Sequence, residues 1–203
     1  MSGVSIKPII QKRMIVALKS TSPMIQHKWG EKAKTMMREK QAGKKSKTRD
    51  IRNPEQECLD ATHFTSTGKF GFPAGALKQA IIGAAHKNIG IEKTLVRKAL
   101  FVNCPDPSNN IEMKTKDPVM REDMMRVGMG AADLRYRPEF AEWSATVMLD
   151  FNAEMLTEQD IVTLLDRAGF GVGLLEGRPE KGRDNGRFEV DMSKKISVQV
   201  LKK

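Results

Sequence analysis

The sequence predicts an α+β fold with a ferredoxin-like (RRM-like) core, in which strand, helix, strand, strand, helix and strand follow one another. Three observations support this class: an alternating apolar strand early in the chain, a second one past its middle, and a helical apolar pattern after each. In this order, two helices cover one face of a four-stranded antiparallel sheet. Two long stretches, 20–72 and 103–141, interrupt the order, and we expect them to be insertions within a single domain that spans 1–203.

The first strand is predicted at 9–19. Met14, Val16 and Leu18 occupy alternate positions there and form one apolar face. We expect the strand to end before Pro23, because proline lacks the N–H group that a sheet requires and turns the chain.

The next two elements are a helix and a strand. The helix is predicted at 74–86, where apolar residues recur at helical spacing and Pro73 stands at the start. The segment 95–102 is rich in β-forming residues and is predicted to be the second strand. The stretch 103–108 contains two prolines, so the strand should end there.

The second half of the chain repeats this order, and its strand at 142–151 is the clearest. One face of that strand is apolar and consists of Trp143, Ala145, Val147, Leu149 and Phe151. A helix should follow, because Thr157 and Asp160 form a variant of the capping box. Its buried stripe is predicted to be Ile161, Val162, Leu164, Leu165 and Ala168. Gly169 is the expected left-handed residue after its last turn.

Two strands are predicted near the end of the chain. The first is 187–192, with Phe188, Val190 and Met192 on one face. The second, 196–200, also alternates and is expected to add an edge strand to the sheet.

The charge of the chain is concentrated in one segment. The 203 residues carry a formal charge of +10, and 28–52 alone contributes +7 of it, with ten basic residues against three acidic ones. The ten are Lys28, Lys32, Lys34, Arg38, Lys40, Lys44, Lys45, Lys47, Arg49 and Arg52. We interpret the segment as a loop beside a short helix that attracts a polyanion, and a solubilising surface loop is the alternative.

Composition restricts where the protein works. The two cysteines, Cys58 and Cys104, are too few for a disulfide scaffold and fit a reducing compartment. The first residues lack the apolar core of a signal peptide, and no run approaches the roughly 18 apolar residues of a membrane helix. We therefore expect a soluble, cytoplasmic protein without a membrane partner.

A glycine-rich segment spans 169–188, with six glycines in eighteen residues and four cations among them, Arg178, Lys181, Arg183 and Arg187. Glycines such as Gly171 and Gly173 let a ligand approach the backbone closely, and backbone N–H groups at such turns bind anions. The glycines follow a helix and no Gly-Lys-Ser/Thr ending occurs, so the segment is neither a P-loop nor a dinucleotide fingerprint. The alternative is a tight helix-to-strand connection.

These pieces together resemble the RAMP superfamily, and most closely the repeated backbone subunit of CRISPR effector complexes. The stretch 18–25 (Leu-Lys-Ser-Thr-Ser-Pro-Met-Ile) is similar to the first strand of that family and its Ser-Pro-Leu turn. The stretch 72–78 (Phe-Pro-Ala-Gly-Ala-Leu-Lys) resembles the start of its first helix, although Ala74 and Ala76 stand where the family more often has Gly and Ser. Gly-Phe-Gly at 169–171 resembles its C-terminal glycine-rich loop, and 177–190 also resembles uncharacterised phage-encoded proteins.

The resemblance implies a ferredoxin-like core that polymerises along single-stranded nucleic acid, and a thumb-like insertion that reaches the neighbouring subunit. The thumb would be 103–141, which is net acidic but contains Arg135, Tyr136 and Arg137, two cations beside an aromatic ring that can stack a base. Its methionines suit a partner surface, and packing into the local core is the alternative.

Catalytic and metal-binding patterns are weak. His27, His63 and His86 are far apart in sequence and no metal-ligand spacing occurs, so we expect no catalytic residues, cofactor or metal. A metal-independent or aspartate-dependent endoribonuclease that uses His27 or Asp50 remains an alternative.

The main hypothesis is therefore a non-enzymatic protein that binds single-stranded RNA or DNA through backbone contacts and assembles head to tail along it, with other effector subunits as further partners. A phage recombination protein that anneals complementary strands is a second alternative.

Overall fold

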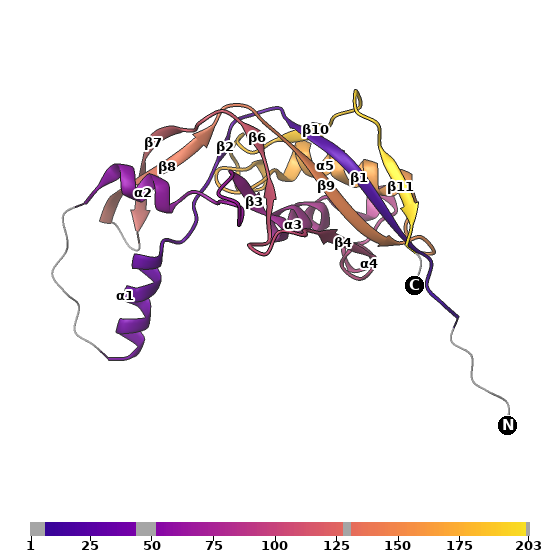
Figure 1. The fold of residues 1–203 in the computed structure, drawn as a ribbon, viewed down its shortest axis with the longest axis horizontal. Coiled ribbons are helices and arrows are strands. Elements are labelled where there is room, and N and C mark those ends of the chain that lie inside the picture. The colour runs from indigo at the N-terminus through magenta and orange to yellow at the C-terminus, as the bar shows by residue number, and fades with distance from the viewer. Residues whose placement is uncertain (1–6, 44–51, 128–130, 202–203) are drawn as a thin grey trace.

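The computed structural model describes residues 7–43, 52–127 and 131–201, and it has a mixed α+β architecture with antiparallel sheets. The described residues contain five α-helices. The molecule is elongated: a sheet-and-helix body occupies one end and an arm occupies the other, as Figure 1 shows. No helix within the described ranges is long and apolar enough to cross a membrane.

The body is built on one antiparallel sheet. Its main path runs in the order β10 (Phe188–Val190), β1 (Gln11–Ser20), β9 (Trp143–Asn152) and β4 (Leu100–Asn103). Two short strands join this path: β11 (Ser197–Val200) pairs with β1, and β6 (Lys114–Thr115) pairs with β9. The predicted strands 9–19, 142–151 and 196–200 are thus confirmed to within two residues.

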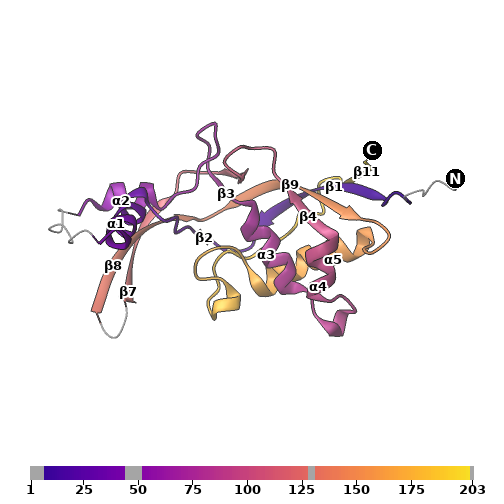
Figure 2. The ribbon, with the colours of Figure 1, turned by 90° about the horizontal axis from the view of Figure 1, so that it is seen from below.

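Two helices cover one face of this sheet, α3 (Ala74–Ala84) and α5 (Glu158–Arg167) (Figure 2). The side chains of Trp143, Ala145, Val147, Leu149 and Phe151 alternate into the core beneath them, as predicted. The capping box of Thr157 and Asp160 is present in full. Ile161, Leu164 and Leu165 are completely buried, and each such side chain contributes about 1.5–3 kcal/mol.

The prediction of a strand at 95–102 was wrong over most of its length. A 3₁₀ turn, η1 (Lys87–Ile89), leads into helix α4 (Lys93–Ala99), and β4 begins only at Leu100. Val96, Ala99 and Leu100 are all completely buried, which is helical spacing. The amine of Lys78 on α3 donates to the carbonyls of Val96 and Leu100, so tertiary contacts stabilise the end of this helix against the β-propensity of its residues.

Two predictions near the end of the chain also need correction. Gly169 is not left-handed, because α5 continues into a π-helical turn, η2 (Ala168–Val172), and the left-handed residue is Gly173 with φ of 72°. Met192 does not share the face of Phe188 and Val190: the strand ends at Val190, where the chain turns, and the Met192 side chain is exposed.

The arm consists of a three-stranded sheet and two helices. The sheet has the order β2 (Met24–Ile25), β8 (Ala131–Phe140), β7 (Val119–Val127), and β7 and β8 form a long hairpin. The helices are α1 (Glu31–Gln41), the short helix expected in the basic segment, and α2 (Pro54–Asp60), which the sequence did not predict. A separate small sheet pairs β3 (Gly71–Pro73) with β5 (Asn110–Glu112), and β3 lies between arm and body in Figure 2.

Candidate nucleic-acid interface

A cavity of about 490 Å³ lies on the helix side of the body, between α3, α4 and the glycine-rich segment. Lys93 and Arg97, four residues apart, project toward it from one face of α4. Arg178 and Glu180 line it from the glycine-rich segment, where a 3₁₀ turn, η3 (Pro179–Lys181), begins. The cavity therefore has three cationic side chains and one acidic side chain in its wall.

Small residues on α3 keep the cavity open. Four of the six α3 residues that line it are small, Gly75, Ala76, Ala80 and Gly83, and larger side chains at these positions would reduce its volume. A Cβ atom on Gly83 would lie 3.2 Å from a methyl carbon of Val172, so this helix also approaches the π-helical turn closely. Ala76 stands where the resembled family more often has Ser, and it is also a small residue in the cavity wall.

The glycine-rich segment forms its side of the cavity with an unusual backbone. Gly173, Leu175 and Gly177 all have left-handed φ values, of 72°, 61° and 64°. A Cβ atom on Gly173 would lie 2.6 Å from the Cδ of Pro179, so only glycine fits there. A positive φ is unfavourable for a residue with a side chain, so the backbone of Leu175 is strained. Strained residues of this kind cluster at functional sites.

The cations of the cavity differ in how they are held. Arg178 donates to the Oε2 of Glu180 at 3.0 and 2.9 Å and to the carbonyl of Leu175 at 3.0 Å, so its guanidinium fixes the loop. Lys93 and Arg97 are exposed, and neither side chain has an ion-pair or hydrogen-bond partner anywhere in the described ranges. The two α4 cations are therefore available to an anionic ligand.

Two of the residues predicted from the sequence to bind nucleic acid line this cavity. Sequence reasoning predicted Gly173 and Arg178, and the structure brings both to the cavity. It missed Lys93 and Arg97, because the segment that contains Arg97 was interpreted as a strand. The signal that would have found them is the spacing of four residues between two cations, which places them on one face of a helix.

The other predicted residues of the glycine-rich segment lie outside the lining of the cavity. Gly171, Lys181 and Arg183 are exposed. Arg187 is partly buried, and its guanidinium lies over the ring of Phe170.

The described part of the predicted basic segment, 28–43 and Arg52, lies in the arm. Lys28 precedes α1, and Lys34, Arg38 and Lys40 lie on this helix, which projects from the molecule in Figure 1. Lys32 is also on α1, but its side chain is outside the described set. Lys44, Lys45, Lys47 and Arg49, together with Asp50, lie outside the described residues.

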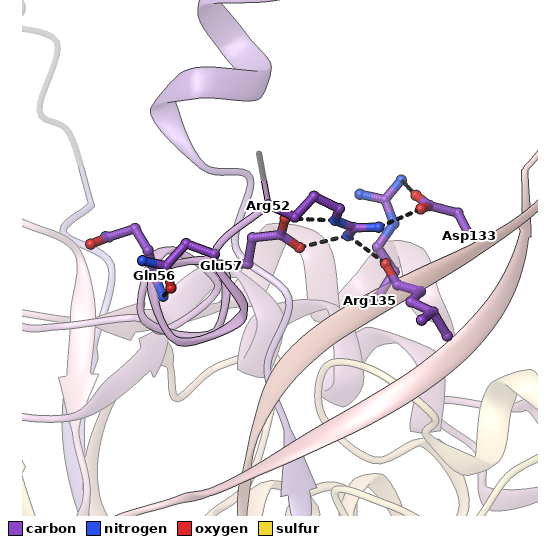
Figure 3. Close-up of polar contacts among 7 residues, drawn as sticks. Arg52, Gln56, Glu57, Asp133 and Arg135 are labelled. Carbon is purple, nitrogen blue, oxygen red and sulfur yellow. Dashed lines mark hydrogen bonds and ion pairs between the residues drawn. The ribbon is translucent and has the colours of Figure 1, made fainter. Parts of the chain in front are cut away.

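Arg52 connects α2 to the hairpin (Figure 3). Its guanidinium forms a two-point contact with Glu57 at 2.8 and 2.6 Å, a bond to Asp133 at 2.8 Å and a bond to the carbonyl of Leu134 at 2.6 Å. Hydrogen bonding by Arg52 lowers the pKa of the Glu57 carboxyl. Because its donors are engaged in this way, Arg52 holds α2 along the outer part of β8.

Three residues of β8 were predicted to bind nucleic acid together, Arg135, Tyr136 and Arg137, but they do not form a single surface. Arg135 pairs with Asp133 at 2.9 Å, and Tyr136 lies beneath the guanidinium of Arg52 with 5.6 Å to the ring centre. Arg137 is 5% exposed and points toward the junction of arm and body, where it contacts Asp123 at 3.3 Å.

A polar junction joins the arm to the glycine-rich segment. The Nη2 of Arg137 lies 3.2 Å from the Nδ1 of His27, which in turn lies 3.8 Å from the Oε1 of Glu176. The backbone N–H of Glu176 also donates to the carbonyl of Ile25. The proximity of His27 and the charge of Arg137 lower the pKa of Glu176 to about 2. These contacts fix the position of the hairpin relative to the body.

The junction predicts a pH dependence of stability. Because the pKa of Glu176 is lowered from 4.5 to about 2, its ionised form stabilises the fold above pH 4.5, and this contribution is lost as the pH falls toward 2. Urea unfolding at pH 6 and near pH 3 should show a smaller fall in stability for Glu176→Gln than for the wild type. Equal falls in the two proteins would contradict this role.

The histidines singled out from the sequence have different surroundings in the structure. His63 is mostly buried, and this burial lowers its pKa to about 4, while His86 caps the turn η1 through its ring nitrogen. The three histidines remain apart, with only His27 at the junction. No group of His, Cys, Asp and Glu in the described ranges has the geometry of a metal site.

The sequence matches no family model and no curated protein. Among solved structures, the chain is similar to the crystal structure of Cmr6 from Pyrococcus furiosus, with 9% identity and a TM-score of 0.44 over 89% of this chain and 98% of that one. It is also similar to a chain of the type III-B Cmr-beta complex bound to cognate target RNA, with 10% identity and a TM-score of 0.42 over 94% of this chain and 61% of that one.

Proposed function

We propose that this chain binds single-stranded nucleic acid through its phosphates, as a non-enzymatic subunit of a CRISPR-type effector complex. The observation that carries the proposal is the cavity beside α4, where two cations without a partner among the described residues face a loop with three left-handed residues. A phosphate chain fits such a combination of charge and closely approachable backbone. The exposed cations of α1 would extend the path along the arm.

We further infer that the four strands β10, β1, β9 and β4 with α3 and α5 are a ferredoxin-like core of a single cytoplasmic domain, carrying 20–72 as a basic arm and 103–141 as a thumb. On one face of the β7–β8 hairpin, Met120, Met124 and Leu134 are all exposed. These three exposed apolar side chains would contact a second copy head to tail, which extends into a filament rather than closing into a dimer.

A titration tests the proposal. Labelled single-stranded oligonucleotides, RNA and DNA, should bind with an affinity that falls steeply between about 50 and 200 mM salt, and duplexes of the same length should bind more weakly. Sedimentation with long single strands should then show several copies per strand. Salt-independent binding or no binding contradicts the proposal, and a chain that stays monomeric on long strands contradicts the assembly.

A further inference from the structure

Phe170 is an exposed aromatic residue with no structural role in the core. Its side chain is 71% exposed, although it lies in the π-helical turn η2 between two residues of the buried interior, Ala168 and Val172. An aromatic ring of this exposure forfeits the stabilisation that burial would give it. π-helical turns are rare and are frequently found at functional sites.

The backbone on both sides of Phe170 is fixed. Gly169 is packed so closely on Phe188 that a Cβ atom would lie 1.8 Å from the Phe188 carbonyl oxygen. On the other side, the N–H of Gly173 donates to the carbonyl of Ala168 at 2.8 Å and closes the turn. The backbone therefore holds the ring at the surface, and binding there costs little further backbone entropy.

One face of the ring is already occupied by a cation. The guanidinium carbon of Arg187 lies over the Phe170 ring, 5.0 Å from its centre. The main chain of Arg187 is itself held, because its N–H donates to Ser22 and its carbonyl accepts from Thr21. Its Nε is buried and has no hydrogen-bond partner among the described residues. The residue Phe170 is 71% exposed, so much of the surface that Arg187 does not cover is open to solvent.

We infer that Phe170 is a stacking platform for one unpaired base, and this inference rests on the proposed binding of single-stranded nucleic acid. The strand whose phosphates enter the cavity passes a turn that shares Val172 with the cavity wall. A base stacks on the face of the ring that Arg187 does not cover and Arg187 supports the other face, which makes the contact tolerant of sequence. A protein partner fits less well, because both sequence neighbours of the ring are glycines and a cation lies over one of its faces.

The test compares two strands and four proteins. The strands are an oligouridine and a strand of equal length in which every base is missing; the proteins are the wild type, Phe170→Ala, Phe170→Tyr and Met192→Ala. Met192 is a matched control because its side chain is also 71% exposed. Phe170→Ala should bind oligouridine about tenfold more weakly than the wild type, and both should bind the abasic strand equally. Phe170→Tyr should restore the affinity, and Met192→Ala should leave it unchanged.

The outcomes separate this inference from the proposal beneath it. If the wild type binds neither strand, the proposed function itself fails. If the wild type binds and Phe170→Ala binds oligouridine equally well, only the stacking platform is overturned. An equal loss on both strands also overturns it, because the ring would then act through the fold. A loss of self-association without a loss of oligouridine affinity would assign Phe170 to a protein partner instead.

Discussion

Reversing the charge of Lys93 and Arg97 together is expected to weaken binding of single-stranded oligouridine by about 100-fold. Both side chains are exposed and unpaired among the described residues, so their replacement leaves no buried partner without its counter-charge. The loss should be uniform across sequences, because phosphate contacts carry no base information. The slope of affinity against salt should also fall, by about one unit for each phosphate contact removed.

A matched control separates the site from general electrostatics. Lys87→Glu with Lys98→Glu changes the net charge by the same amount, and both residues are exposed cations outside the cavity lining. This control pair should lose only a small part of the affinity in fluorescence anisotropy titrations. If the two double variants bind equally weakly, the cavity beside α4 is not the binding site.

Replacing Gly169 by alanine is expected to have the largest effect on stability, with a loss of about 3 kcal/mol or more. The new Cβ atom would lie 1.8 Å from the carbonyl oxygen and 2.6 Å from the carbonyl carbon of Phe188. Both are backbone atoms of β10, and β10 is paired with β1 through Phe188 and Ser20. The clash therefore cannot be relieved without moving a strand of the main sheet.

Gly171 supplies the control for this prediction, two residues further along the same turn. A Cβ atom there meets nothing within 4 Å, and its φ is not left-handed. Gly171→Ala should therefore be neutral, or more stable by up to about 1 kcal/mol because the unfolded chain loses freedom. Urea unfolding followed by circular dichroism compares the two variants. Equal midpoints for Gly169→Ala and Gly171→Ala would show that the turn adapts to a side chain.

The elements that sequence reasoning predicted correctly are those with a local signature. The strand at 142–151 alternates strictly because one face is buried under helices and the other is not. The helix after Thr157 was found from its cap, which involves residues only three apart. Such patterns depend on neighbours along the chain and can be read without the tertiary structure.

The parts that were missed depend on distant contacts. Helix α4 is stabilised through Lys78, eighteen residues before Val96, so its β-forming composition was misleading. The cavity needs residues of α3, α4 and the glycine-rich segment, which only the tertiary fold brings together. The role of Gly169 was also invisible, because the restriction comes from Phe188 and not from the backbone angle of the glycine itself.

The pairing of β1 has a consequence for the order in which the chain folds. This strand, near the start of the chain, pairs with β9, β10 and β11, all more than 120 residues further on. Closing such long loops lowers the entropy of the chain before any favourable contact offsets the loss, and this slows folding. During synthesis, β1 has no partner strand of this sheet until β9 has emerged from the ribosome. The edge of β1 that pairs with β10 and β11 is fully paired only after β11 has been made. We therefore expect slow refolding and a need for protection of the nascent first strand.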